Sequence, residues 1–454
     1  MNARADTALR QLANQARAMR AADAPESVRR QARLCILDTV GCTLAGTRTE
    51  EAQLMLACEP ATADTAATVF GTPQRRSLLG AARINAYLGD VLELNDLIGG
   101  HASIGNVNAA LALGEAVGAS GSSVLEAVIR GIEVTTRVYE AVYPSLRRYT
   151  EMAMVPVGLP STIGAAAAAA HLLALDEEQT LNAMAIAGSL AGWCPAAVIF
   201  GNGGTVKPLL FGAQPAELGI RAAHHARAGM TGPADLLDSP LGYFASASTA
   251  GRFDPSAWDG RWALDQPRRK LHACCGYLHA PADALGQLRQ RGHALQDLHV
   301  SLRVAPYVAD VVSKDRMPVS ANDARFHLQY CLALVACGAD VILPEHSIGL
   351  ADHLQRPEVP AMMRRIRVIP DPALTHYHQS RIELIDGNGR MTVQEVSAPR
   401  GSPQSPLADE EVVRKFHALA DPVLGSAHSA RFASQTLDLE AVESVPDWIA
   451  LLRT

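Results

Sequence analysis

The sequence predicts a mainly helical protein with a second, α+β domain. Apolar residues recur at helical spacing from about residue 27 to residue 230. Past about residue 270, short segments alternate apolar and polar residues, as half-buried strands do. At 454 residues the chain is also longer than one hydrophobic core usually extends, so two domains are expected.

The first domain is expected to be a bundle of closely packed helices. The run over residues 26–46 keeps helical spacing and ends at a glycine, which predicts one helix. Residues 109–142 predict two helices separated at Gly118 to Gly121, and residues 162–192 predict another pair. Alanine-rich faces with only 5% aromatic residues favour helices that approach closely.

The second domain is expected to contain strands. Residues 298–305 and 365–369 alternate as strands do, and residues 380–397 predict a hairpin that turns at 386–389. A helical tail follows, which we expect to return to the first domain. The predicted boundaries are 1–266 with 402–454 for the helical domain, and 267–401 for the α+β domain.

Composition excludes several classes of protein. A net charge of −6 and a pI of about 6.2 offer no electrostatic footprint for nucleic acid or an anionic membrane. No signal peptide or membrane-spanning run is evident, so a cytoplasmic protein is expected. The eight cysteines lack paired CxxC spacing, which predicts neither a zinc site nor an iron–sulfur cluster.

The stretch LELNDLIGGHASIGN, residues 92–106, is polar although it lies between alanine-rich helical segments. We expect it to line a cleft, and its glycines to allow a tight backbone path. Asn106 or Asn108 could cap a helix beginning near Ala109. The candidate site residues of this stretch are Glu93, Asp96, His101 and Ser103.

GNGGTVKP, residues 201–208, resembles a phosphate loop only superficially. It lacks GxxxxGK[ST] spacing and has Pro208 where a hydroxyl should bind magnesium. Lys207 is still a candidate functional residue, because a mostly apolar helical run follows it. There it could clamp a carboxylate or act as a base, or it could simply cover apolar surface.

RRKLHACCGYLHAPADA, residues 268–284, opens the second domain. Lys270, His272 and His279 are interspersed with small residues ahead of a predicted helix, so they could face a cleft between the domains. A single histidine is more often structural. Tyr330 lies on a predicted apolar helix. Considered by itself, it is expected to pack in the hydrophobic core.

The order and wording of these stretches resemble the MmgE/PrpD family. The matching segments span nearly the whole chain: LDTVGCTLAG (37–46), AALALGEAVGASG (109–121), TVKPLLFGAQPAELGIRAA (205–223), AGMTGPADLLDSPLGYF (228–244), NDARFHLQYCLAL (322–334) and GSPQSPLADEEVVRKF (401–416). The resemblance implies a helical domain built from both chain ends, a smaller α+β lid, an active site in the cleft between them, and a homodimer. It also implies a small polycarboxylate substrate, with no metal and no organic cofactor.

The matching motifs carry over candidate residues one by one. The resemblance implies catalytic roles for His101, Asp96, Lys207, His279 and Tyr330, and substrate binding by Lys270, Glu93, Ser103 and Cys275. The sequence departs from the family pattern at three positions. Leu97 stands where a threonine is usual, Ala102 where a proline is usual, and Leu159 where a histidine is usual.

Members of the family form or protonate a carbanion-like centre beside a carboxylate, which needs a base and nearby positive charge. The expected mechanism docks substrate carboxylates on Lys207 and Lys270, with His101, supported by Asp96, as base. His279 or Tyr330 would protonate a leaving hydroxyl. Dehydration, decarboxylation and epimerisation all stay open, as does a non-catalytic carboxylate-binding protein.

Overall fold

The computed structural model describes residues 6–61, 66–202, 204–250, 260–295, 298–385 and 390–454. Most of the chain before residue 250 is helical, and a π turn, Leu209–Ala213, leads into α10. A ribbon of two antiparallel strands, β1 and β2, lies between α3 and α4. The helices and strands of this part are α1 (Ala8–Ala18), α2 (Glu26–Gly46), α3 (Glu50–Cys58), β1 (Ala67–Thr68), β2 (Arg75–Arg76), α4 (Leu78–Val91), α5 (Ala102–Val117), α6 (Gly121–Glu140), α7 (Leu159–Leu172), α8 (Glu177–Leu190), α9 (Ala196–Asn202), α10 (Gln214–Arg227) and α11 (Tyr243–Ala247).

Helix α7 lies at the centre of this part and contacts α5, α6, α8 and α10. Small residues allow the close packing. A Cβ atom at Gly164 of α7 would lie 2.0 Å from Thr135 Oγ1 and 2.4 Å from the carbonyl oxygen of Gly131 on α6. Larger side chains at this crossing would push the two helices apart.

The other part contains a mixed sheet of four strands in the order β4-β3-β5-β6. Strand β3 is parallel to β4 and antiparallel to β5, and β5 is antiparallel to β6. Helix α12 packs on β5 and β6. The elements are α12 (His279–Gln290), β3 (His299–Val304), α13 (Pro306–Val312), α14 (Ala321–Arg325), α15 (Leu328–Ala336), α16 (Pro344–Ile348), α17 (Leu350–Gln355), α18 (Glu358–Met363), β4 (Ile366–Pro370), β5 (Ser380–Ile385) and β6 (Met391–Val396).

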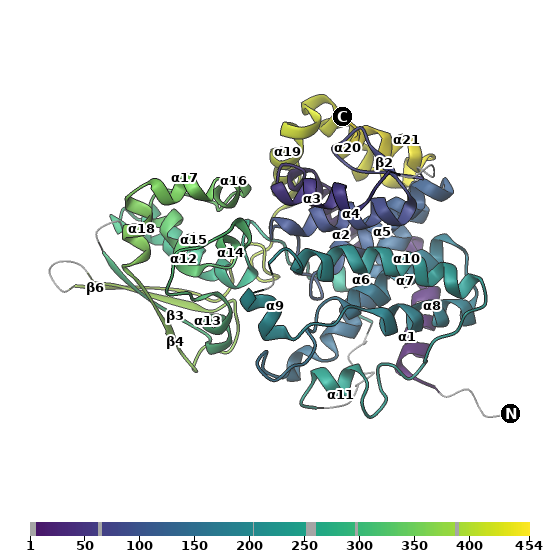
Figure 1. Cartoon of the computed structure of the whole chain (residues 1–454), viewed down its shortest axis with the longest axis horizontal. Helices are drawn as coiled ribbons and strands as arrows, with labels where there is room; N and C mark the ends of the chain where they lie inside the picture. Colours follow the sequence, from purple (N-terminus) through teal and green to yellow (C-terminus); the bar gives the residue numbers. More distant parts are fainter. Residues whose placement is uncertain (1–5, 62–65, 203, 251–259, 296–297, 386–389) are drawn as a thin grey trace.

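The predicted fold class, mainly α with an α+β part, is confirmed. Strands occupy the two segments predicted from alternation, 298–305 and 365–369. The hairpin turn predicted at 386–389 lies outside the described residues. Figure 1 shows the sheet and its helices on one side of the molecule and the helical bundle on the other. The domain boundaries given above stay a prediction.

The chain ends in α19 (Asp409–Leu424), α20 (Ser426–Leu437) and α21 (Val445–Ile449), which lie over the bundle in Figure 1. Helix α19 packs on α2, and Phe416, Phe432 and Trp448 are buried in one core cluster with residues of α2 and α6. The last segment of the chain thus covers the same core as the first long helix. None of the described helices is both long and apolar enough to cross a membrane.

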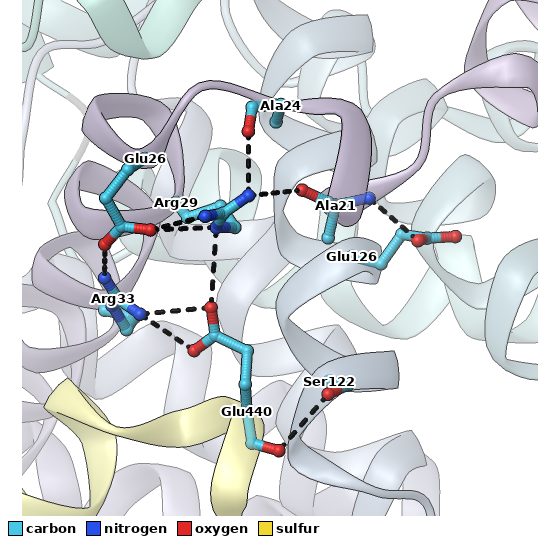
Figure 2. Close-up of polar contacts among 8 residues, drawn as sticks. All are labelled: Ala21, Ala24, Glu26, Arg29, Arg33, Ser122, Glu126 and Glu440. Atoms are coloured by element: carbon cyan, nitrogen blue, oxygen red, sulfur yellow. Dashed lines mark hydrogen bonds and ion pairs between the residues drawn. The ribbon is translucent and has the colours of Figure 1, made fainter.

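An ion-pair network ties the C-terminal segment to α2 (Figure 2). Arg33 Nη1 donates to Glu440 Oε2 at 2.8 Å, and Arg33 also pairs with Glu26. Arg29 donates to Glu26 at 2.7 Å and to the carbonyl oxygen of Ala24 at 2.9 Å. The network therefore joins residues about four hundred positions apart in sequence.

Replacing Glu440 with glutamine is expected to lower the free energy of unfolding by about 1 kcal/mol, because the pair with Arg33 is only partly exposed to solvent. The loss should shrink at high salt. Urea denaturation at low and high salt measures it. Glu443→Gln, an exposed position with the same change of charge, is the control, and an equal loss in both variants would contradict the network's contribution.

One helix begins earlier than the sequence predicted. Helix α5 begins at Ala102, with His101 as its N-cap residue, and not near Ala109. Asn106 and Asn108 therefore do not cap it: they lie inside α5, where their side chains donate to the carbonyl oxygens of Ala102 and Ile104. These bonds to the preceding turn let buried asparagines sit within a helix.

Candidate active site

The segment between α4 and α5 follows an unusual backbone path. Glu93 and His101 have positive φ angles of 54° and 73°, and Gly99 and Gly100 have φ angles of 44° and 70°. Left-handed conformations are rare for residues with side chains and cluster at functional sites. Glycine is required at Gly99 because a Cβ atom there would lie 2.3 Å from Thr136 Oγ1 on α6.

This segment forms one wall of a cavity of about 70 Å³ where the helical bundle meets the sheet-containing part. The bundle contributes the α4–α5 segment, α6 and the turn before α10, among others, and the other part contributes the segment before α12 together with Phe326 and Tyr377. The lining residues include Glu93, Leu97, Gly100, His101, Tyr139, Tyr143, Tyr149, Val157, Phe200, Lys207, Phe211, Arg268, Cys275, Gly276, Tyr277, Phe326 and Tyr377. Of residues 92–106, for which a cleft lining was predicted, Glu93, Leu97, Gly100 and His101 line this cavity.

Two lysines and two carboxylates form a buried ionic cluster at the cavity wall. Lys207 Nζ donates to both carboxylate oxygens of Asp90 at 2.8 Å and also pairs with Glu93. Lys270 Nζ donates to Glu93 Oε2 at 2.9 Å and to the Glu93 carbonyl oxygen at 3.1 Å. All four side chains are at most 3% exposed, so their charges are compensated by one another and not by water.

The ion pairs favour the charged forms of Glu93 and Lys270, whereas burial raises the pKa of Asp90 above its usual value. Burial alone would raise the pKa of Glu93, but the ammonium groups of Lys207 and Lys270 outweigh it and hold that pKa well below its usual range. Burial opposes the charge of Lys270 as well, yet the Glu93 carboxylate raises its pKa above the usual value. The site therefore holds fixed positive and negative charge at neutral pH.

Lys207 is positioned by the chain that follows it. The π turn Leu209–Ala213 brings the ring of Phe211 beneath the ammonium, with Nζ 4.7 Å from the ring centroid. The same ring lies 5.9 Å from the imidazole of His101. Turns of this kind occur frequently at functional sites, and here one aromatic ring contacts both predicted catalytic groups.

A chain of hydrogen bonds fixes the tautomer of His101. Asn95 Nδ2 donates to Asp90 Oδ1 at 2.6 Å, so the Asn95 amide oxygen faces His101 Nδ1 at 2.7 Å. An amide oxygen only accepts hydrogen bonds, so Nδ1 carries the proton and Nε2 keeps its lone pair. Burial, followed by the charges of Lys270 and Lys207, lowers the pKa of His101 well below its usual value. The imidazole is therefore a neutral base at neutral pH.

The expected support of His101 by the Asp96 carboxylate is corrected by this geometry, because Asn95 takes that place. The Asp96 carboxylate instead accepts a hydrogen bond from Ser103, away from the cavity lining. Burial raises the pKa of Asp96 to about 6. Asp96 and Ser103 therefore bond to each other, and neither lines the cavity.

The remaining predicted residues are divided between the cavity and the core. Cys275 lines the cavity, and burial raises the pKa of its thiol to about 12. Tyr330 donates to the carbonyl oxygen of His346 at 2.6 Å and is buried in the core of the sheet-containing part. His279 is buried against His272, and its Nε2 has no hydrogen-bond partner in the part of the chain that is described. Neither Tyr330 nor His279 lines the cavity.

Asp90, Asn95 and Arg268 were not among the predicted site residues, and neither were the cavity-lining Tyr149 and Tyr277. Asp90 closes the last turn of α4 three positions before Glu93, a spacing that could have revealed the carboxylate pair. Arg268 belongs to three consecutive basic residues, 268–270, which are too few to change the negative net charge of the chain. Leu97, at one of the three departures from the family pattern, lines the cavity with an apolar side chain.

Comparison with known proteins covers nearly the whole chain. The MmgE/PrpD N-terminal domain matches residues 10–256, and the MmgE/PrpD C-terminal domain matches residues 272–441. The chain is 26% identical to a cis-aconitate decarboxylase-like protein of Aspergillus oryzae, over 97% of this chain and 96% of that protein. It is 26% identical to the cis-aconitate decarboxylase of Aspergillus terreus, over 95% and 92% of the two chains. It is 27% identical to the human cis-aconitate decarboxylase, over 86% and 82%.

Proposed function

The chain belongs to the MmgE/PrpD family, and on this premise we propose that it is a lyase that removes a proton from the carbon beside a carboxylate of a small organic acid. The observation that carries the proposal is the hydrogen-bond chain at the cavity, in which the Asn95 amide oxygen faces His101 Nδ1 and leaves His101 Nε2 as the base. A positioned base of this kind accelerates proton abstraction substantially.

The proposed reaction is a dehydration. His101 Nε2 takes the proton, the electrons of the C–H bond form a C=C bond, and the C–O bond breaks so that hydroxide leaves with a proton as water. Tyr149 and Tyr277 line the cavity and their hydroxyl oxygens lie 2.6 Å apart. Burial raises the pKa of both phenols, which keeps them protonated as hydrogen donors to the leaving group.

Decarboxylation is the second candidate, and the similarity to cis-aconitate decarboxylases over most of the chain favours it. In that reaction a C–C bond breaks, carbon dioxide leaves, and the carbon that keeps the electrons is protonated. Positive charge beside the reacting carbon stabilises the developing negative charge in this reaction, as it does in proton abstraction. The di- and tricarboxylates predicted from the family resemblance form one set of candidate substrates, and acids with one carboxylate form another. We also propose that the protein is a cytoplasmic homodimer, as the family resemblance and the sequence led us to expect.

A substrate screen with the unmodified protein tests the function. Candidate hydroxy acids and unsaturated acids are first ranked by ligand-induced thermal shift. The binders are then assayed for ultraviolet absorbance of a new C=C bond and for release of carbon dioxide. Absorbance without carbon dioxide supports dehydration, and carbon dioxide supports decarboxylation. Binding without turnover of any acid would favour a non-catalytic carboxylate-binding protein.

A further inference from the structure

We propose that the substrate carries a single carboxylate, and the hydroxyl that dehydration removes, on an otherwise apolar, unsaturated or aromatic body, and that Arg268 binds this carboxylate. The inference rests on the proposed function, since it names the substrate of the same site. It differs from the polycarboxylate class implied by the family resemblance. Two features of the cavity carry it: the balance of charge and the chemistry of the walls.

The ionic cluster has no spare positive charge for a substrate. The ammonium of Lys207 meets three carboxylate oxygens from Asp90 and Glu93, which uses all three of its N–H groups. Lys270 is bound twice by Glu93, through the side chain and the main chain. Burial raises the pKa of Asp90, but Lys207 Nζ donates to both of its carboxylate oxygens at 2.8 Å, which is the geometry of an ion pair. Counted this way, two cations face two anions and the cluster is neutral. A substrate carboxylate could contact either lysine only by displacing a carboxylate that is already buried there.

Arg268 is a positively charged residue that lines the cavity and does not belong to the ionic cluster. It has no ion pair within the described part of the chain, and Tyr377, which lines the cavity too, lies beside its guanidinium. Glu140 acts on it only as a more distant charge. A guanidinium can hold a carboxylate through two parallel N–H bonds. The cavity thus provides for one negative charge.

The walls favour an apolar body. Aromatic rings surround the cavity, among them Tyr139, Tyr143, Phe200, Phe211, Tyr277 and Tyr377. Leu97 and Val157 add apolar surface. A second or third carboxylate would be buried among these rings without a compensating cation, which is costly. An alkenyl or aryl group would instead be buried against surfaces of matching polarity.

Isothermal titration calorimetry on the intact protein at fixed ionic strength tests the inference with trans-cinnamate, crotonate, fumarate and tricarballylate. The two monocarboxylates are expected to bind at least about tenfold more tightly than tricarballylate, and Arg268→Gln to weaken them about tenfold. Arg356→Gln, the same change at a surface position that is 47% exposed, should leave the affinities unchanged. Tricarballylate binding more tightly than both monocarboxylates, or cinnamate binding unaffected by Arg268→Gln, would overturn the inference.

A second variant tests the charge balance independently of Arg268. Glu93→Gln removes one anion from the cluster and should shift the preference about tenfold toward fumarate over crotonate, because one cation becomes available. An unchanged preference in a variant with a native circular dichroism spectrum would contradict the charge argument. Turnover of a tricarboxylate would refute the inference while supporting the proposed lyase. Tight binding of monocarboxylates without turnover of any acid would refute the lyase and support the inference.

Discussion

Replacing Lys207 with methionine is expected to lower the free energy of unfolding by about 3–5 kcal/mol. It is also expected to abolish turnover, because Lys207 holds Asp90, and Asp90 in turn holds Asn95 against His101. Methionine keeps an apolar stem of similar length, so the main change is loss of the ammonium. Asp90 and Glu93 would then be buried side by side with only Lys270 to compensate them. Urea denaturation and turnover of the identified substrate measure the two effects.

The stability loss should depend on pH with a defined sign. In the unmodified protein the pKa of Glu93 is below its usual value of 4.5, so its contribution is present above that pH and is lost as pH falls through the lower, folded value. Without Lys207, the carboxylates should titrate above their usual range, and the variant should recover stability as pH falls. The difference between the two proteins is therefore largest at neutral and alkaline pH.

The double variant Lys207→Met with Glu93→Gln is the matched control. It restores the balance of one cation and one anion, so it should regain most of the stability but none of the activity. A single Lys207→Met variant as stable as the unmodified protein at pH 8 would contradict the ionised cluster. An active double variant would remove Lys207 from the catalytic machinery.

The fold was predictable from the sequence because hydrophobic periodicity reports directly on which face of each element is buried. The change of period near residue 270 separated the two kinds of structure, and helix α2 covers the segment 26–46 that spacing and Gly46 indicated. The start of α5 was missed because its first turn follows a left-handed residue, His101, and its asparagines bond within the helix. Local bonding of this kind has no signature in periodicity.

The sequence indicated several of the ionisable residues of the candidate site, but it did not indicate which of them pair with one another. Lys207, Glu93 and His101 stood out because ionisable side chains lay next to apolar runs. Which group bonds to which depends on side-chain direction across elements distant in sequence, as in the contact between Lys207 and Asp90. The sequence could not show that Tyr330 turns toward a main-chain carbonyl in the core, since core and cleft faces of one apolar helix look alike.

Replacing His101 with asparagine is expected to lower turnover by about a thousandfold with little loss of stability. Asparagine tolerates the left-handed conformation that His101 adopts, but it has no nitrogen lone pair that can take a proton. Steady-state kinetics gives the loss. Because the pKa of His101 lies well below its usual value, the acid limb of kcat/KM in the unmodified protein should fall well below pH 6.5.

The hydrogen-bond chain through Asn95 should be separable from the imidazole itself. Asn95→Leu removes the acceptor that holds the proton on Nδ1, so we expect kcat to fall about tenfold to a hundredfold while the imidazole remains. Nitrogen-15 NMR of His101 should show the Nδ1–H form in the unmodified protein and a mixture in the variant. Asn108→Leu, a buried exchange within α5, is the matched control and should leave the His101 spectrum unchanged. If the Asn95 variant keeps a pure Nδ1–H form and full activity, the amide does not set the tautomer and the base is oriented by other contacts.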